Sequence, residues 1–223
     1  MEHFVYNSPE FKNYLEKESH VRGEMKFLQS IVEKGMKVID IGANVGITTV
    51  IIAKKIGAKG KVYSFEPVTR YFNILKKNLS SNNLKNIEVL KLAVSNQVGR
   101  INFYDNGDAS SIVPQRGIKK FKVSTSTIDI FLEQKKEKKI DLINMDCEGS
   151  ELLVLKGAKE TLRRNKIKIF CEIHHDFLNR LQQSAQDIVK YLKGINFKVH
   201  SVRLDDLKLR NNFRNCEYIY AYN

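Results

Sequence analysis

The sequence has few cysteines and prolines and no tryptophan. Its three cysteines are widely separated and include no C-x-x-C pair, which excludes the spacing of a zinc knuckle and of a small disulfide-bonded scaffold. Only three prolines are present, and no low-complexity tract marks a linker. We therefore expect a single domain over residues 1–223, with a helical segment at 1–35 and the main fold over 36–223.

Long apolar runs are also missing, and acidic residues are outnumbered. No stretch of eighteen apolar residues could form a transmembrane segment, and residues 1–20 are too charged for the core of a signal peptide. A cytoplasmic location is the expectation. Lys and Arg number 38 against 25 Asp and Glu, a net charge of +13. That excess could attract RNA or another anion, but the basic residues are scattered, so a solvated basic surface is the favoured interpretation.

Strand-like and helix-like patterns alternate in the first half of the chain. Apolar residues at helical spacing occupy 24–34 and end at Gly35. Three apolar strands, each followed by a polar break, then read "MKVIDI", "KVYSFE" and "IEVLKLAV", with helical patterns between them. This alternation predicts a parallel sheet with crossover helices.

The second half interrupts this rhythm and then resumes it. Residues 99–125 predict an inserted ribbon or loop over the sheet. Strands "KIDLINMD" and "KIKIFCEIH" follow, separated by a helix that is interrupted near Gly157. After a last helix, "FKVHSV" and "CEYIYAYN" have no helix between them, which indicates an antiparallel edge pair.

The stretch "VIDIGANVG" at 38–46 is the first candidate for a ligand site. It lacks the G-x-G-x-x-G of a dinucleotide site, and no Lys-Ser or Lys-Thr pair follows Gly46 as in a P-loop. Asp40 would repel a phosphate at this turn, whereas it would attract the sulfonium and ammonium groups of S-adenosylmethionine. Gly42 and Gly46 would let the backbone turn and approach the ligand closely.

A second acid supports the same cofactor. Glu66 ends the next strand, twenty residues after Gly46, where its carboxylate could accept hydrogen bonds from both ribose hydroxyls. Pro67 fixes the chain as it leaves that strand. Together with Asn44, these polar side chains at strand ends predict an S-adenosylmethionine pocket.

Candidates for a general base follow the two later parallel strands. A hydroxyl acceptor must lose its proton as it attacks the methyl group, and Asp146, Glu148, Glu172 and His174 lie where that base is needed. Two neighbouring carboxylates would raise one pKa, or could hold Mg²⁺ instead. Alternatively, Glu148 and Glu151 could only stabilise a helix N-terminus, and His174 could be a structural hydrogen-bonding residue.

The motifs taken together resemble the FkbM-type S-adenosylmethionine-dependent methyltransferases. The shared pieces are "DIGANVG", "FEP", "LKKN", "LAVS", "TIDIFL", "DLINMDCEGSELLVLKGA" and "EIH". The resemblance implies a Rossmann-like class I methyltransferase fold, an α/β fold with a seven-stranded mostly parallel sheet. It also implies O-methylation of a hydroxyl on a small molecule or sugar.

The resemblance also assigns individual positions. It places the methionine end of the cofactor near Glu24 and the adenine near Ala93 and Val94. The positions that match the family's cofactor site are Glu24, Asp40, Gly42, Asn44, Gly46, Glu66, Ala93 and Val94. Pro67 and Asp146 complete the predicted cofactor residues because of their places at strand ends. Asn144 stands where the family often has Lys. The other hypotheses left open are an RNA methyltransferase and a cofactor-binding interaction protein without catalysis.

Overall fold

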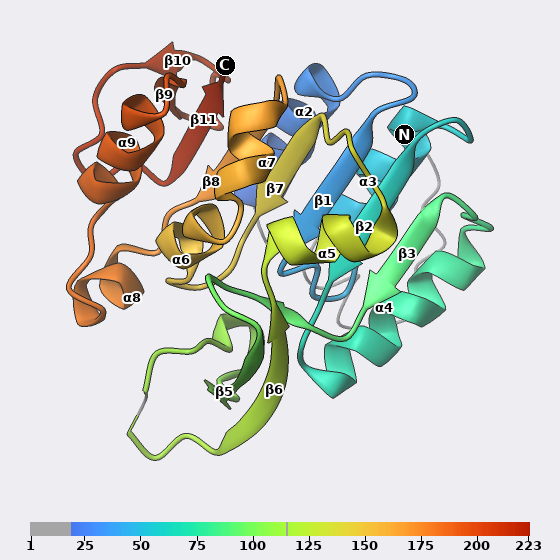
Figure 1. Cartoon of the computed structure of the whole chain (residues 1–223), viewed down its shortest axis with the longest axis horizontal. Helices are drawn as coiled ribbons and strands as arrows, with labels where there is room; N and C mark the ends of the chain where they lie inside the picture. Colours follow the sequence, from blue (N-terminus) through green and yellow to red (C-terminus); the bar gives the residue numbers. More distant parts are fainter. Residues whose placement is uncertain (1–18, 115) are drawn as a thin grey trace.

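A twisted eight-stranded sheet forms the centre of the computed structural model, which describes residues 19–114 and 116–223 (Figure 1). The strand order is β10-β9-β11-β8-β7-β1-β2-β3. The five parallel strands, in that order, are β8 (Lys168–Glu172), β7 (Leu142–Met145), β1 (Lys37–Ile41), β2 (Lys61–Phe65) and β3 (Ile87–Leu90). The expected parallel sheet is confirmed.

The other edge of the sheet is antiparallel, as the late strand pair predicted. β11 (Tyr218–Tyr222) runs antiparallel to β8 on one side and to β9 (Lys198–Val202) on the other. A further strand of two residues, β10 (Leu209–Arg210), pairs with β9. The sheet therefore has eight strands where seven were expected, because the short strand β10 adds one at the edge.

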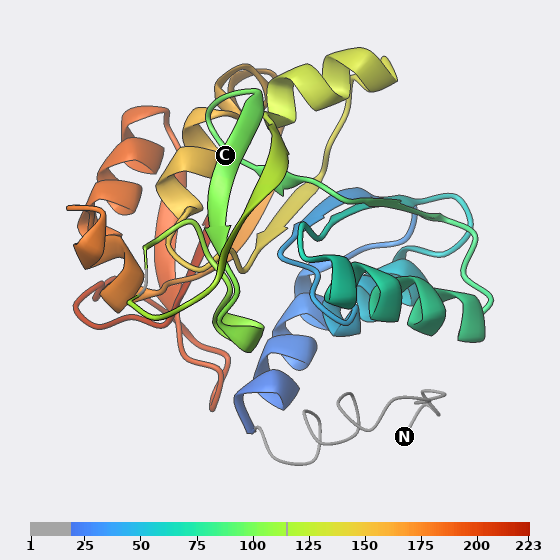
Figure 2. The ribbon, with the colours of Figure 1, turned by 90° about the horizontal axis from the view of Figure 1, so that it is seen from below.

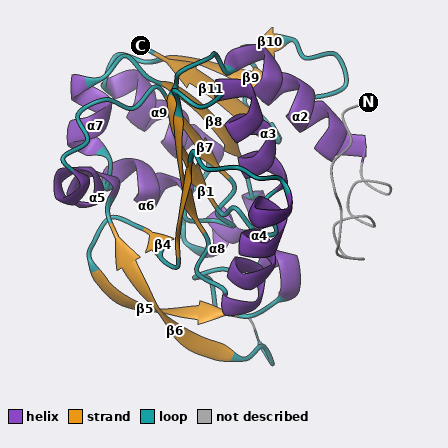
Figure 3. Ribbon diagram, turned by 90° about the vertical axis from the view of Figure 1, so that its right-hand side faces the viewer, coloured by secondary structure: helices purple, strands orange, loops and turns teal. Residues whose placement is uncertain are grey.

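Helices cover both faces of the sheet (Figure 3). One layer holds α2 (Ser19–Ile31), α3 (Ile47–Ile56) and α4 (Thr69–Ser81), and the other holds α5 (Ile128–Lys135), α6 (Glu151–Lys156), α7 (Lys159–Arg164) and α9 (Ala185–Gly194). Neighbouring strand residues point to opposite faces. Val38 and Leu142 accordingly pack with α2 and α3, whereas Ile39 and Ile143 pack with α5 to α9. Burial on both faces explains the continuously apolar strands.

The ribbon predicted within 99–125 is present beyond the carboxyl ends of the parallel strands (Figures 1 and 2). β5 (Gly99–Tyr104) pairs antiparallel with β6 (Lys120–Ser126), and β4 (Ala93–Val94) joins β6 in parallel. The prediction of a single strand over 87–94 is therefore wrong. The chain leaves the main sheet after β3 and continues as β4 in the ribbon sheet.

Several helix boundaries follow from local chemistry. Gly157 separates α6 from α7, as expected, and a Cβ there would lie 2.1 Å from the Ser95 carbonyl oxygen. Two helices were not predicted: α5, whose Thr127 hydroxyl accepts a hydrogen bond from the Ile130 amide, and the short α8 (His175–Arg180). Of the N-terminal segment expected to be helical, residues 1–18 lie outside the described residues.

Membrane-spanning helices were not expected. Among the helices of residues 19–114 and 116–223, none has both the length and the apolar character needed to cross a bilayer.

Candidate functional site

The turn after β1 depends on two glycines with positive φ. Gly42 has φ +78°, and a Cβ on it would lie 1.6 Å from the carbonyl oxygen of Asp146. Only glycine therefore allows the ends of β1 and β7 to meet here. Gly46, with φ +95°, is the N-cap residue of α3, and a Cβ on it would lie 2.4 Å from Leu75 Cδ1.

Asp40 lies behind this turn. Its side chain is fully buried and accepts hydrogen bonds from the Thr48 and Thr49 hydroxyls and from Asn144 Nδ2, the last at 2.8 Å. Burial raises the pKa of the Asp40 carboxyl, and these hydrogen bonds oppose the rise. Asn144 thus supplies a neutral donor to Asp40 at the position where the resemblance has Lys. Asp40 itself does not line the cavity described next.

Glu66 and Asn44 form part of the polar wall of a cavity that is open to solvent. Glu66 Oε2 accepts a hydrogen bond from the Asn44 amide at 2.9 Å, and Oε1 accepts one from the Val68 amide at 2.7 Å. Burial raises the pKa of Glu66 to about 7, although both backbone amides lower it. Each carboxylate oxygen keeps a lone pair that a ligand hydroxyl could use.

The cavity brings together most of the predicted cofactor residues. Those that line it are Gly42, Asn44, Glu66, Pro67, Ala93, Val94 and Asp146. The apolar side chains Phe65, Val68, Tyr71 and Phe103 also line it, and so does Ser110. The sequence did not single these out. Phe103 and Ser110 come from the ribbon region, which was predicted to lie over the sheet, but their individual positions depend on the β5–β6 pairing.

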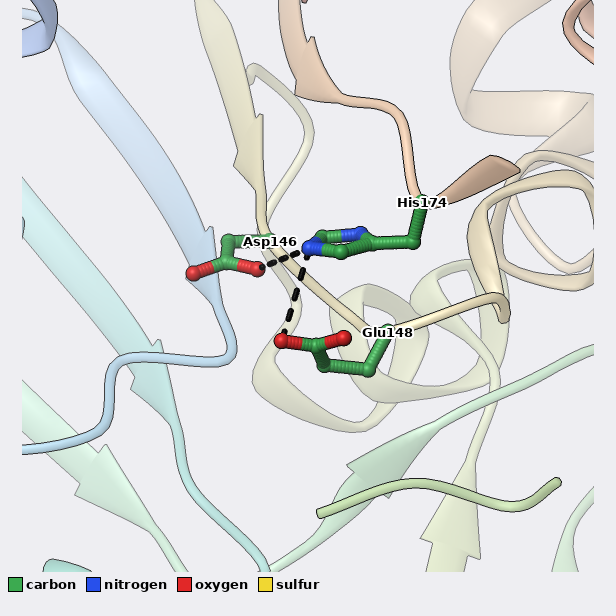
Figure 4. Close-up of side chains that lie close together, drawn as sticks. All are labelled: Asp146, Glu148 and His174. Carbon is green, nitrogen blue, oxygen red and sulfur yellow. Dashed lines mark ion pairs between the residues drawn. The ribbon is translucent and has the colours of Figure 1, made fainter. Parts of the chain in front are cut away.

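The four predicted catalytic residues lie together at this cavity, and Figure 4 shows three of them, Asp146, Glu148 and His174. His174 Nε2 lies 3.4 Å from Asp146 Oδ1, 3.4 Å from Glu148 Oε1 and 4.0 Å from Glu172 Oε1. Asp146 and Glu148 follow β7, and His174 follows Glu172 at the end of the adjacent strand β8. The pairing of β7 with β8 therefore creates the cluster.

Glu151 is a member of this cluster that was not among the predicted site residues. It is fully buried in the first turn of α6, and its Oε1 lies 2.9 Å from His174 Nδ1. The Gly149 amide donates to the same oxygen at 3.0 Å. The alternative role of Glu151, stabilising the helix N-terminus, is compatible with this position. The acidic pattern "DCEGSE" was the available signal, but the contact with a residue 23 positions later required the fold.

The ionisation of the cluster follows from its crowding. Burial alone lowers the pKa of His174, but the hydrogen bond to Glu151 and the charges of Asp146 and Glu148 raise it to about 10. Burial raises the pKa values of Glu148 and Glu172, and nearby carboxylates add to the rise while His174 opposes it. Asp146, Glu148 and His174 are also close enough to share a cation.

Glu24, predicted near the methionine end of the cofactor, approaches the same cluster from α2. Desolvation raises the pKa of the Glu24 carboxyl well above its usual value, and the like charges of Glu172, Asp146 and Asp40 contribute. Carboxylates from α2, β8 and the segment after β7 are therefore close enough to influence one another.

Comparison with known proteins is consistent with this geometry. The family model of the FkbM methyltransferase domain matches residues 40–199. The chain is 28% identical to the 2-O-methyltransferase NoeI of Sinorhizobium fredii over 204 residues, which cover 82% of each chain. It is 24% identical to the methyltransferase sdnD of Sordaria araneosa over 157 residues, 55% of this chain and 60% of that protein.

Solved structures share the fold. The O-methyltransferase of Bacillus cereus in complex with S-adenosylhomocysteine aligns with a TM-score of 0.58 at 14% identity, covering 96% of this chain and 87% of that one. The expected Rossmann-like class I fold is confirmed. The chain therefore belongs to the FkbM methyltransferase family and is an S-adenosylmethionine-dependent methyltransferase.

Proposed function

We propose that this enzyme methylates a hydroxyl oxygen of a small molecule or sugar. The observation that carries the proposal is the group of carboxylates and imidazole at the ends of β7 and β8, next to the cavity that Gly42 and Glu66 line. Amines that are free bases need no such group, whereas an alcohol must lose a proton during attack. The name of NoeI, a 2-O-methyltransferase, agrees with an oxygen acceptor.

The cofactor is proposed to lie along the cavity with its ribose hydroxyls on Glu66. Its adenine would lie by Ala93 and Val94, where Phe65 and Phe103 supply apolar surface. Its methionine end would point toward Asp146 and Glu24, whose negative charges attract the ammonium and sulfonium groups. Asp40 would act indirectly by holding the turn at Gly42 in place.

In the reaction, a lone pair of the acceptor oxygen attacks the methyl carbon. The carbon–sulfur bond breaks, its electron pair stays on sulfur, and S-adenosylhomocysteine results. The hydroxyl proton passes to a carboxylate of the cluster. His174 Nε2 faces Asp146 and Glu148 at 3.4 Å each, so its proposed part is to hold these carboxylates in place. Alignment of the three reacting atoms can supply roughly 7 to 11 kcal/mol.

The test is transfer of a labelled methyl group from S-adenosylmethionine to candidate acceptors. A panel of sugars, oligosaccharides and hydroxylated small molecules is compared with total RNA, and products are identified by mass spectrometry. We expect labelling of a hydroxyl compound and a loss of about 10² to 10⁴ in rate for Asp146→Asn. Asp176→Asn, an exposed acid on α8, serves as the matched control and should keep its activity.

Two outcomes would contradict the proposal. Labelling confined to RNA would show that the acceptor is RNA and not a small molecule or sugar. Failure to bind S-adenosylhomocysteine in calorimetry would favour an interaction protein without catalysis.

A further inference from the structure

Three side chains beside the cavity present metal-ligand atoms to one point in space (Figure 4). One ligand atom from each of Asp146, Glu148 and His174 lies within 4.8 Å of the others. His174 Nε2 lies 3.4 Å from each carboxylate, which is longer than a strong charged hydrogen bond. Two ligand atoms at about 2.1 Å from one ion stand roughly 3.0 to 3.4 Å apart, so these distances suit ligands of a shared cation.

The backbone holds Glu148 in an unusual conformation to reach this point. Glu148 has φ +48°, which is uncommon for a residue with a side chain, and Gly149 follows with φ +94°. A Cβ on Gly149 would lie 2.6 Å from the Cβ of Phe177, so the turn is tightly packed against α8. Strained residues of this kind concentrate at functional sites because the surrounding packing maintains them.

Glu151 provides a separate observation that points to a cation. Glu151 is fully buried, and its Oε1 lies within hydrogen-bond distance of His174 Nδ1. Its Oε2 accepts no hydrogen bond from residues 19–114 or 116–223. A carboxylate can only accept, so Nδ1 carries the proton of that bond and Nε2 faces Asp146 and Glu148. Imidazoles that bind metals are held in this way by a carboxylate on their second nitrogen.

The charge of the cluster is also unbalanced. Within residues 19–114 and 116–223, the ion pairs of Glu148, Glu151 and Glu172 all run to the one imidazole of His174. When all three carboxylates are ionised, a single imidazolium cannot neutralise them. Buried charges are normally paired or bound to a metal, so a further cation would relieve this excess.

We propose that Asp146, Glu148 and His174 bind a divalent metal ion, with Glu151 as the positioning residue for the imidazole. One nitrogen and two carboxylate ligands suit Mn²⁺ or a similar transition metal better than Mg²⁺, which prefers oxygen ligands alone. The role of the ion in catalysis rests on the proposed function: it would coordinate the acceptor hydroxyl and lower its pKa. Glu172, which is not a ligand, would then accept the proton.

Mn²⁺ alone is the probe. The full chain is treated with a chelator, dialysed and titrated with Mn²⁺, and free Mn²⁺ is measured by electron paramagnetic resonance. We expect one ion per chain and binding at least tenfold weaker in Asp146→Asn, Glu148→Gln and His174→Gln. Glu151→Gln should weaken binding by about 10- to 100-fold. Asp176→Asn and His200→Gln, on α8 and the distant strand β9, should match the parent chain.

Circular dichroism and calorimetry with S-adenosylhomocysteine establish that each variant is folded. The proposal is overturned if the parent chain binds no Mn²⁺, or if folded His174→Gln binds it equally well. If methyl transfer persists in chelator and the chain binds no Mn²⁺, the metal-site proposal is refuted and the proposed function is retained. Specific Mn²⁺ binding without transfer to any hydroxyl compound would leave the metal site and remove the function.

Discussion

Glu66 offers a direct test of the buried carboxylate in the proposed cofactor cavity. Its side chain is 4% exposed, and burial raises its pKa from 4.5 to about 7 despite two hydrogen bonds from backbone amides. The folded chain therefore holds this proton more tightly than the unfolded chain. As pH rises from about 4.5 to about 7, the unfolded state loses the proton first, and the free energy of unfolding falls.

The size of this effect follows from the difference between the two pKa values. At about 1.4 kcal/mol for each pKa unit, Glu66 should reduce the free energy of unfolding by about 3 kcal/mol between pH 4 and pH 8. Glu66→Gln removes this dependence. It also places an amide nitrogen beside one backbone N–H, which adds a penalty that does not vary with pH.

Urea unfolding at several pH values measures the prediction. Other acids of the site also titrate, so the informative quantity is the difference in free energy of unfolding between the parent chain and Glu66→Gln at each pH. That difference should change by about 3 kcal/mol across the range. For the exposed control Glu133→Gln, the difference from the parent chain should stay the same at every pH. A difference for Glu66→Gln that stays constant would refute the assignment of a buried, proton-binding carboxylate.

Cofactor binding should show the opposite trend with pH, because ionised Glu66 is the better acceptor for ribose hydroxyls. Affinity for S-adenosylhomocysteine should rise about tenfold from pH 6 to pH 8 through this group. Calorimetry would measure it, and the rise through pH 7 should be absent in Glu66→Gln.

The remaining predictions concern the turn after β1 and one helix cap. Asn144→Asp would replace the donor to Asp40 by a second buried carboxylate and should lower the free energy of unfolding by about 3 to 5 kcal/mol in urea; exposed Asn102→Asp is the control. Gly42→Ala would force a Cβ onto the Asp146 carbonyl and should destabilise the chain far more than Gly35→Ala. Gly35 has a similar φ but open space around it, so only about 1 to 2 kcal/mol should be lost there in thermal unfolding. Ser184→Ala removes the capping box of α9 and should cost about 1 kcal/mol; an unchanged midpoint would show that the cap is not needed.

Sequence patterns predicted the strands and the acids at their ends because both depend on local order along the chain. Glu66 and Asp146 each follow an apolar strand, and parallel strands place their ends at one edge. The pairing of Glu151 with His174 could not be predicted in this way. It depends on β8 lying next to β7 and on the turn at Gly149, which tertiary packing determines.

The alternation of residues along β1 could have predicted that the Asp40 side chain points away from the cavity. In "KVIDI" it shares its strand face with Val38, and successive residues alternate between faces. Asp40 therefore points toward α3, where Thr48 and Thr49 meet it, whereas Gly42 and Asn44 after the strand reach the cavity. Asp40 lies inside its strand and Glu66 follows the next strand, so the two acids have different surroundings.

The contrast between net charge and site charge bears on the acceptor. The chain carries +13 overall, yet four acids, Asp146, Glu148, Glu151 and Glu172, lie together at the proposed point of methyl transfer. Basic residues such as Arg100 and Lys122 are exposed on the ribbon instead. A phosphate or carboxylate next to the reacting hydroxyl would be repelled by the cluster. We therefore expect acceptors that are neutral or cationic near the methylated oxygen, with any anionic group far enough away to meet the ribbon.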